Sequence, residues 1–335
     1  MSRKNKIWSI LVHLSMNMWD TDYKTLPFDD EMWTWIIEES ARIGLNTIIL
    51  DVGDGIRYPS RPEIAMPGAW DAERIHAEIA RCKEKGIALI PKLNFSAAHD
   101  QWLGDYARMI SSKAYYALAK DLINDAYELF EHPEFIHLGM DEEGIQYVGE
   151  RDYVCMRQGE LYWHDLKFLL DCVNATGARP WIWSSPLYDY PEQYKAHIGP
   201  KEAIINPYYY NAFREDHYTS VDATPATRVY YNEGIYKDRG FKWVEQDPYL
   251  ENFRNVALPL LKEGYDYIPC ASVFNRCDWN HADLLEYFRD KAPDDQILGY
   301  LTAPWVVTLP NEKAKLYYEE TFRFMKEAMD EFYPE

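Results

Sequence analysis

The chain has 335 residues, and 55 acidic side chains against 35 basic ones give it a net charge of −20. Such a surface repels phosphate backbones and anionic lipids, which argues against a nucleic-acid or membrane partner. The chain has no run of 18 apolar residues, and its five cysteines form no CxxC pair, so neither a membrane span nor a disulfide or zinc framework is predicted.

Residues 1–16 place basic side chains before an apolar run, as a signal peptide does. His13 interrupts the run and no small-residue cleavage site follows it, so we interpret the segment as the first strand. We expect a soluble protein that is either cytoplasmic or exported with its signal removed. The oligomeric state is left open.

Short apolar segments alternate with amphipathic helical stretches, which is typical of parallel strands joined by helical crossovers. The predicted strands are 7–14, 47–52, 87–93, 135–140, 180–184, 203–210, 267–273 and 297–303. One predicted helix starts near residue 29 and ends at the glycine at 44, and the others cover 71–85, 112–130, 161–175, 249–263 and 311–333. The segment 228–232 also resembles a strand, but no helix separates it from 203–210, so we assign it to a long loop or hairpin.

This pattern predicts an α/β protein, a (β/α)8 TIM barrel that forms a single domain over 1–335. No linker or break in composition divides the chain. The alternative architecture is an open doubly wound sheet, which rarely needs eight strands of this spacing.

Functional side chains of a parallel barrel lie where its strands run into helices. In this chain these positions hold mainly carboxylates, amides and aromatic rings, without a glycine-rich phosphate loop. The candidate site residues are His13, Asp51, Asn94, His99, Asp141, Glu142, Trp183, Tyr209, Asn275 and Trp305.

Aromatic residues make up 16% of the chain, with 12 Trp and 27 Tyr. They could fill a tryptophan-rich core, but we favour a cleft lined with rings, which suits the apolar faces of a carbohydrate substrate. Within 208–210 only every second ring can face that cleft, and we assign Tyr209 to it.

Three consecutive acids, Asp141, Glu142 and Glu143, follow the fourth predicted strand. Their mutual repulsion raises at least one pKa, as a general acid near neutral pH requires. A solvated acidic loop is the alternative, but the buried strand and the small Gly139 before the acids favour a catalytic role.

The segment His-Leu-Gly-Met-Asp-Glu at 137–142 resembles the His-x-Gly-x-Asp-Glu signature of glycoside hydrolase family 20, the β-N-acetylhexosaminidases. Three further segments are similar to the third-, fifth- and eighth-strand regions of that family. They are 90–94 with His99 downstream, 181–183, and 299–305.

This resemblance implies an exo-acting, retaining glycoside hydrolase in which the substrate assists its own cleavage. Asp141 would polarise a 2-acetamido group, and Glu142 would be the general acid and base. Trp183 and Trp305 would form walls of the sugar pocket, and His99 would orient a carboxylate.

Three positions depart from the family pattern and fall on substrate-binding groups. The first strand lacks the arginine for sugar hydroxyls, and Trp305 is followed by two valines where the family has Trp-x-Glu. Phe274 or Asn275 stands near the place of the seventh-strand tyrosine. These departures favour a different sugar or linkage.

Two other functions stay open at this point. One is a carbohydrate-binding barrel without turnover. The other is a conventional two-carboxylate glycosidase acting on a non-acetamido sugar, with Glu233 or Asp278 opposite Glu142. A carboxylate separation of about 5 Å would then predict retention, and about 6.5–9.5 Å inversion.

We predict neither a catalytic metal nor a cofactor. The nine histidines are scattered, and no HxH or HExxH motif is present. His137 precedes the acids, but strand alternation predicts that it points to the other side of the strand.

Overall fold

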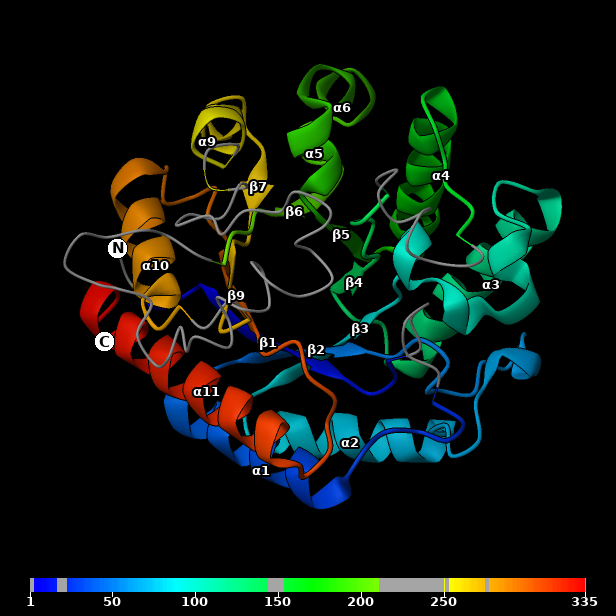
Figure 1. Ribbon diagram of the computed structural model, residues 1–335, viewed down its shortest axis with the longest axis horizontal. Coiled ribbons are helices and arrows are strands. Elements are labelled where there is room, and N and C mark those ends of the chain that lie inside the picture. The colour runs from blue at the N-terminus through cyan, green and yellow to red at the C-terminus, as the bar shows by residue number, and fades with distance from the viewer. Residues whose placement is uncertain are drawn as a thin grey trace, which may run out of the picture.

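A computed structural model describes residues 3–16, 23–143, 154–210, 250, 253–274 and 277–334. Helices surround a central sheet on all sides (Figure 1). Its strands are β1 (Ile7–His13), β2 (Thr47–Asp51), β3 (Ala88–Lys92), β4 (Phe135–His137), β5 (Arg179–Trp183), β6 (Ile204–Asn206), β7 (Asp266–Tyr267), β8 (Cys270–Ser272) and β9 (Gly299–Ala303).

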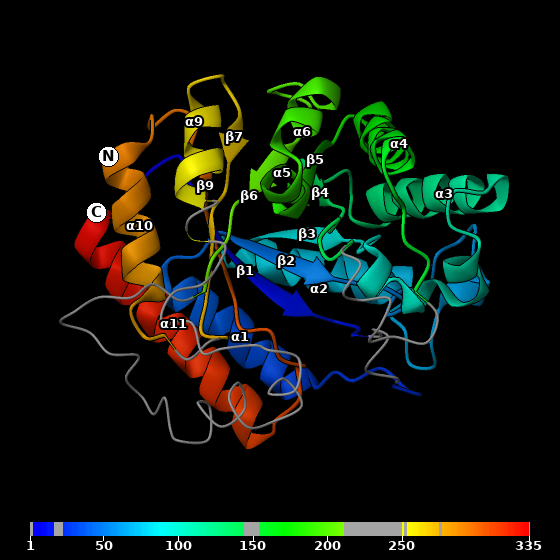
Figure 2. The same cartoon turned by 45° about the horizontal axis from the view of Figure 1, so that its top comes forward.

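The strands follow one another in the order β7-β6-β5-β4-β3-β2-β1-β9-β8, and all neighbours are parallel. Figure 2 shows β1, β2 and β3 side by side. Parallel neighbours in chain order require a crossover between each pair, which the helices provide.

The sheet closes on itself because β7 and β8 are parts of one extended segment, 266–272, which Pro269 interrupts. On one side, the Cys270 N–H donates to the Pro207 carbonyl at 2.8 Å. On the other, the Leu298 N–H donates to the Tyr267 carbonyl at 2.9 Å. The predicted (β/α)8 barrel is therefore confirmed, with 266–272 as its seventh strand.

The α-helices are α1 (Asp30–Ile43), α2 (Ala72–Glu84), α3 (Lys113–Leu129), α4 (Glu160–Thr176), α5 (Ser185–Asp189), α6 (Pro191–His197), α9 (Leu258–Leu261), α10 (Asn280–Lys291) and α11 (Glu312–Phe332). The predictions for α1, α2, α3, α4 and α11 are correct to within one residue at each end. Their boundaries are encoded locally: the Asp29 and Asp71 side chains accept the Met32 and Arg74 N–H groups as N-caps.

Other helices differ from the prediction. The stretch predicted as one helix over 249–263 contains a π-helix (Phe253–Ala257) followed by the short α9. We did not predict α5, α6 or α10. The first two are only five and seven residues long, so they show little helical periodicity.

The core has two layers, as alternation along the strands requires. Alternate strand residues point into the barrel, among them Leu11, Ile49, Ile90 and Leu301. Their neighbours, such as Ile10 and Ile48, pack under the helices.

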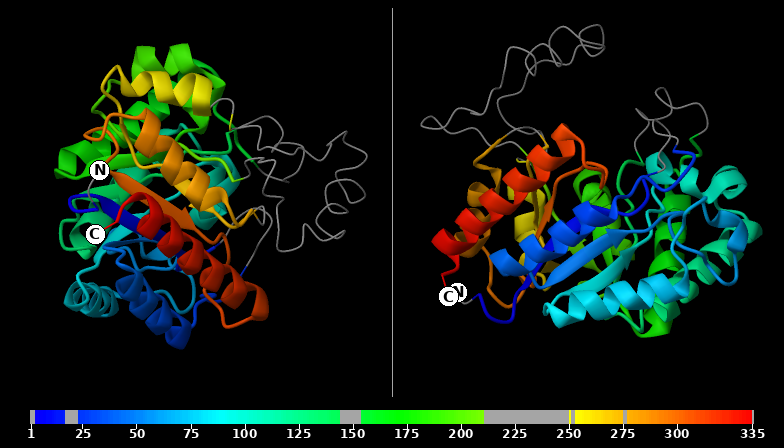
Figure 3. Two further views of the ribbon diagram at one scale, coloured as in Figure 1. Left: turned by 90° about the vertical axis from the view of Figure 1, so that its left-hand side faces the viewer. Right: turned by 90° about the horizontal axis from the view of Figure 1, so that it is seen from below.

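The last helix, α11, packs against both α1 and α10 and so completes the ring of helices (Figure 1). The two ends of the chain lie close together (Figure 3), and Arg3 donates to the Tyr333 carbonyl at 2.9 Å. No helix in the described ranges is long and apolar enough to cross a membrane.

Candidate active site

The acid pair, Asp141 and Glu142, lies in the connection that follows β4, at the carboxyl end of the barrel. The backbone there is unusual, since Gly139, Met140 and Glu142 have φ angles of 74°, 66° and 47°. A Cβ atom on Gly139 would lie 2.0 Å from Oδ1 of Asn94. Glycine is therefore needed for the loop after β3 to approach the loop after β4.

Ser96 joins these two loops. Its hydroxyl donates to Oδ1 of Asp141 at 2.5 Å, and the Asp141 N–H donates back to the hydroxyl oxygen at 3.1 Å. The Ser96 N–H also donates to Oδ1 of Asn94 at 3.2 Å. The sequence prediction included Asn94 but missed Ser96. Its position just after β3 was the only available signal.

His99, at the end of a 3-10 helix (Ala97–His99), contacts both acids. Its Nε2 atom is 2.6 Å from Oε2 of Glu142 and 3.7 Å from Oδ2 of Asp141. Burial alone would lower the pKa of His99, but the charges of Glu142 and Asp141 outweigh it and raise this pKa to about 9. The imidazole is therefore protonated at neutral pH.

The pKa of Asp141 is raised. Burial is the main cause, and the negative charge of Glu142 adds to it, while His99 and Lys92 partly oppose the rise. This direction agrees with the expectation that crowding of the acids raises at least one pKa.

A buried ion pair lies at the ends of β2 and β3. Nζ of Lys92, which is 1% exposed, lies 2.5 Å from Oδ2 of Asp51, and Nδ1 of His13 lies 3.3 Å from the same oxygen. Burial alone would raise the pKa of Asp51, but Lys92 and His13 hold it well below its ordinary value. Asp51 is therefore an anion. The prediction missed Lys92, although a lysine within an apolar strand was a visible signal.

Two tryptophans stand beside these charges. The rings of Trp183 and Trp305 are 5.5 Å apart, and the Trp305 ring is 6.0 Å from that of His13. Neither indole N–H has a hydrogen-bond partner among the described residues. The five residues predicted to converge end or follow strands at the carboxyl end of the barrel, and their roles stay predictions: Asp51, Asn94, Asp141, Trp183 and Trp305.

The structure corrects the prediction for Tyr209. Its hydroxyl donates to Oδ2 of Asp283 on α10 at 2.6 Å, and its ring packs on Phe253. It therefore faces the helices. Tyr208 and Tyr210 face the other way, with the Tyr208 ring 5.8 Å from that of Trp183. The prediction that alternate rings face opposite sides was correct, but the wrong ring was assigned to the cleft. Which side of the strand faces the inside depends on how the strand is placed in the barrel.

The prediction for His137 was also wrong. Its ring lies inside the barrel, 5.0 Å from the Trp183 ring, and its Nε2 is 2.9 Å from Oδ1 of Asn206. Burial, helped by the charge of Lys92, lowers the pKa of His137 to about 3, so the ring is neutral. Inside the barrel it packs against Trp181 and Trp183.

Some predicted positions cannot be placed with the others. Asn275, Glu233 and the strand-like segment 228–232 lie outside the described residues. Asp278 lies in the turn that precedes α10.

His99, Asp141 and Glu142 each offer one possible metal ligand, and these atoms lie within 4.8 Å of one another. However, Nε2 of His99 already binds Glu142 directly, and a protonated imidazole nitrogen has no lone pair for a metal. A metal at this cluster would have to displace that proton, and the absence of a metal stays a prediction.

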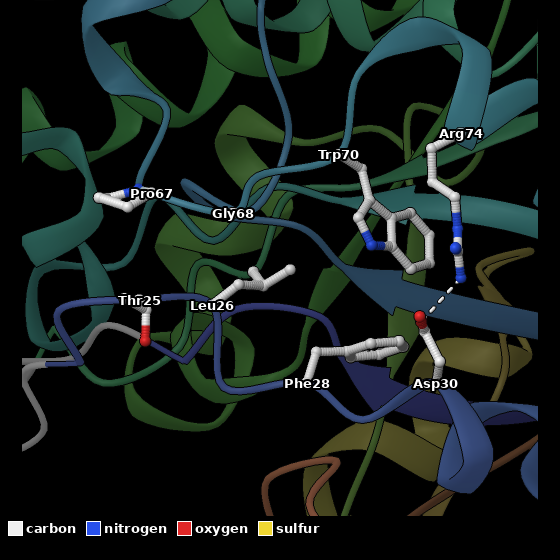
Figure 4. Close-up of a pocket in the computed structure, with 8 residues that line it drawn as sticks. All are labelled: Thr25, Leu26, Phe28, Asp30, Pro67, Gly68, Trp70 and Arg74. Carbon is white, nitrogen blue, oxygen red and sulfur yellow. Dashed lines mark hydrogen bonds and ion pairs between the residues drawn. The ribbon is translucent and has the colours of Figure 1, made fainter.

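A separate hollow of about 440 Å³ lies between the connections β1–α1 and β2–α2 (Figure 4). Phe28 and Trp70 line it, and its Arg74 is paired with Asp30 at 2.8 Å. None of its lining residues is among those around the acid pair, so we place the candidate active site at the acid pair.

His99 is expected to make stability depend on pH. Its pKa is about 9 in the folded state against an ordinary value of about 6.5, so its contribution is complete below pH 6.5 and is lost as the pH rises through 9. The contribution is at most about 3 kcal/mol. Urea unfolding at a series of pH values should show His99→Gln losing most stability at the acid end of this window. A deficit that stays constant up to pH 10, or appears equally in His132→Gln, an exposed histidine, would contradict this expectation.

The fold is a (β/α)8 barrel, and an acid pair lies at the carboxyl end of its strands. No protein-family model and no curated protein matches the sequence. Solved structures do match its fold. A β-N-acetylhexosaminidase from Bacteroides fragilis matches 98% of this chain over 66% of its own, with 12% identity and a TM-score of 0.59.

Two other structures give the same result. The exo β-N-acetylglucosaminidase of glycoside hydrolase family 20 from Vibrio harveyi, in complex with N-acetylglucosamine, matches 100% of this chain over 55% of its own, with 14% identity and a TM-score of 0.61. Dispersin B matches 98% of this chain over 100% of its own, with 13% identity and a TM-score of 0.56. The chain thus spans about two thirds or less of the first two. The resemblance to family 20 is confirmed at the level of the fold.

Proposed function

We propose that the protein is a glycoside hydrolase, exo-acting and retaining, with Asp141 and Glu142 as its catalytic pair. The observation that carries this proposal is the cluster of His99, Glu142 and Asp141 at the carboxyl end of the barrel. Trp183 ends the next strand, where its N–H donates to the Gly139 carbonyl at 2.9 Å, and its ring lies 5.5 Å from that of Trp305. Such a site combines side chains that can hold and donate a proton with the flat apolar rings of two tryptophans, which suits cleavage of a glycosidic bond.

Glu142 acts first as the general acid. Glu142 gives a proton to the glycosidic oxygen while the bond from this oxygen to the anomeric carbon breaks, and His99, whose Nε2 lies 2.6 Å from Oε2 of Glu142, supplies that proton. In the assisted mechanism, the carbonyl oxygen of a 2-acetamido group bonds to the anomeric carbon. Glu142 then takes a proton from a water molecule. This water attacks the anomeric carbon and opens the ring that the acetamido oxygen had formed. Two inversions give net retention.

Asp141 orients the acetamido group in this mechanism. The Ser96 hydroxyl fixes Oδ1, and Oδ2 is the oxygen that accepts the acetamido N–H. The carboxylate then stabilises the positive charge that develops on the cyclised intermediate.

Trp183 and Trp305 stack against the apolar face of the sugar. Their indole N–H groups, without partners among the described residues, donate to sugar oxygens. Asp51, which Lys92 holds as an anion, accepts hydrogen bonds from sugar hydroxyl groups, and His13 beside it takes part in binding them. These two residues take over the role for which the family uses an arginine on its first strand.

A panel of aryl glycosides, with and without a 2-acetamido group, tests the proposal. Wild-type protein is expected to release the aryl group from at least one exo substrate, with the anomeric configuration retained by NMR. Release from an acetamido sugar alone would support assistance, and release from other sugars would support two carboxylates. Binding of sugars without release from any of them would establish the non-enzymatic alternative, which the missing Trp-x-Glu acid favours.

A further inference from the structure

Glu143, the third acid of the triplet, has no part in the reaction above, yet its carboxylate accepts hydrogen bonds from the Ala97 N–H, the Arg157 N–H and the Arg157 guanidinium. We propose that Arg157 is a positioning residue that holds Glu143 and so fixes the loop that aims Glu142 at His99. This inference rests on the proposed role of Glu142 and adds a residue outside the catalytic motif.

The guanidinium of Arg157 is fully buried, and each of its nitrogen atoms has an acceptor. Nη1 donates to Oε1 of Glu143 at 2.5 Å, and Nε donates to Oδ2 of Asp165 at 3.0 Å. Nη2 donates to the Tyr115 hydroxyl at 2.7 Å. A planar group bound at every nitrogen has one orientation, which a lysine could not reproduce.

The far side of this network is anchored to the helical scaffold. Asp165 lies on α4, and its carboxylate accepts hydrogen bonds of 2.6 Å from Ser111 and from Tyr116 on α3. Through Arg157, the position of Glu143 is therefore fixed relative to α3 and α4. A site built on rigid elements is held more accurately than one supported by loops.

The near side of the network connects the two catalytic loops. The Ala97 N–H donates to Oε1 of Glu143 at 2.8 Å. Ala97 follows Ser96, whose hydroxyl binds Asp141. Glu143 is thus the point where the loop after β3, the loop after β4 and Arg157 meet.

This anchoring is needed because Glu142 has a φ of 47°, in the left-handed region that a non-glycine residue seldom adopts. Such a conformation persists only where the surroundings impose it. Ser96 holds Asp141 on one side of Glu142, and Arg157 holds Glu143 on the other. Without the second hold, Glu142 is free to relax away from His99.

The test uses Arg157→Met, with Arg179→Met as the matched control. Arg179 also forms a partly buried ion pair, to Oδ2 of Asp266 at 2.6 Å, but at the start of β5, where the barrel has its opposite end. If Arg157→Met is poorly folded, Glu143→Gln weakens the same contact by removing the negative charge that Arg157 binds, and it leaves Arg157 bound to Asp165 and Tyr115.

The first readout is the titration of His99 by NMR, assigned with His99→Gln, and it requires no substrate. Glu142, Asp141 and Lys92 are the charged groups that act on this imidazole. In Arg157→Met its pKa is expected to fall from about 9 toward the ordinary value of about 6.5, because Glu142 has moved away. In Arg179→Met it stays where it is. The inference would be overturned if the pKa of His99 were unchanged in both Arg157→Met and Glu143→Gln, or if it fell equally in Arg179→Met.

The second readout is kinetic. A misaligned acid costs about 10²-fold in kcat with little change in KM, and the loss is larger for poor leaving groups than for activated ones. Simple loss of folded protein would lower the rate by the same factor for substrates with poor and with activated leaving groups. If wild-type protein cleaves no glycoside, the proposed function fails, while the His99 titration still decides whether Arg157 positions Glu142.

Discussion

Replacing Glu142 with glutamine is expected to lower kcat/KM for an unactivated glycoside by about 10²–10⁴-fold. Glutamine keeps the shape of the side chain but carries no transferable proton, so the leaving oxygen departs as an anion. The loss should shrink for aryl leaving groups of low pKa, which need little protonation. Steady-state kinetics across a series of leaving groups measures this dependence directly.

Glu128→Gln is the control for this substitution, because Glu128 is an exposed acid on α3 whose side chain bonds to His132. It should keep wild-type kinetics with every leaving group. Unchanged activity of the Glu142→Gln variant on the unactivated glycoside would show that another residue is the general acid.

The second large effect is expected at Asp141, because this residue separates substrate assistance from a conventional nucleophile. Asp141→Asn keeps the contact with Ser96 but loses the negative charge that stabilises the cyclised acetamido group. Turnover of an acetamido substrate should fall by about 10²–10³-fold, the usual cost of one lost electrostatic stabiliser. A thiazoline analogue of the cyclised intermediate should bind wild-type protein far more tightly than the parent sugar does, and this advantage should decrease in the variant.

In the assisted mechanism no covalent bond forms between the sugar and the protein. Mass spectrometry after incubation with a 2-fluoro glycosyl fluoride should therefore detect no adduct. A label on Asp141 or on Glu233 would replace the assisted mechanism with a two-carboxylate one. Asp171→Asn, an exposed acid on α4, serves as the control for the loss of one carboxylate.

The sequence alone determined the parts of this protein that depend on local patterns. The strands, the helices α1 to α4 and α11, and the acids after β4 follow from apolar periodicity, N-cap side chains and glycines, which act within a few residues. A barrel then brings its strand ends together, so the approach of Asn94 and Asp141, which both bind Ser96, could also be predicted. The place of His99 beside a carboxylate was implied by the family resemblance.

Only the tertiary structure decided which side chains meet across the barrel. It placed Tyr208 rather than Tyr209 beside Trp183, and it turned His137 inward. It also paired Lys92 with Asp51, and Arg157 with Glu143. The physical reason is that the inward face of a strand, and the partner of a buried charge, are fixed by strand register and by contacts between distant segments, which local sequence patterns do not encode.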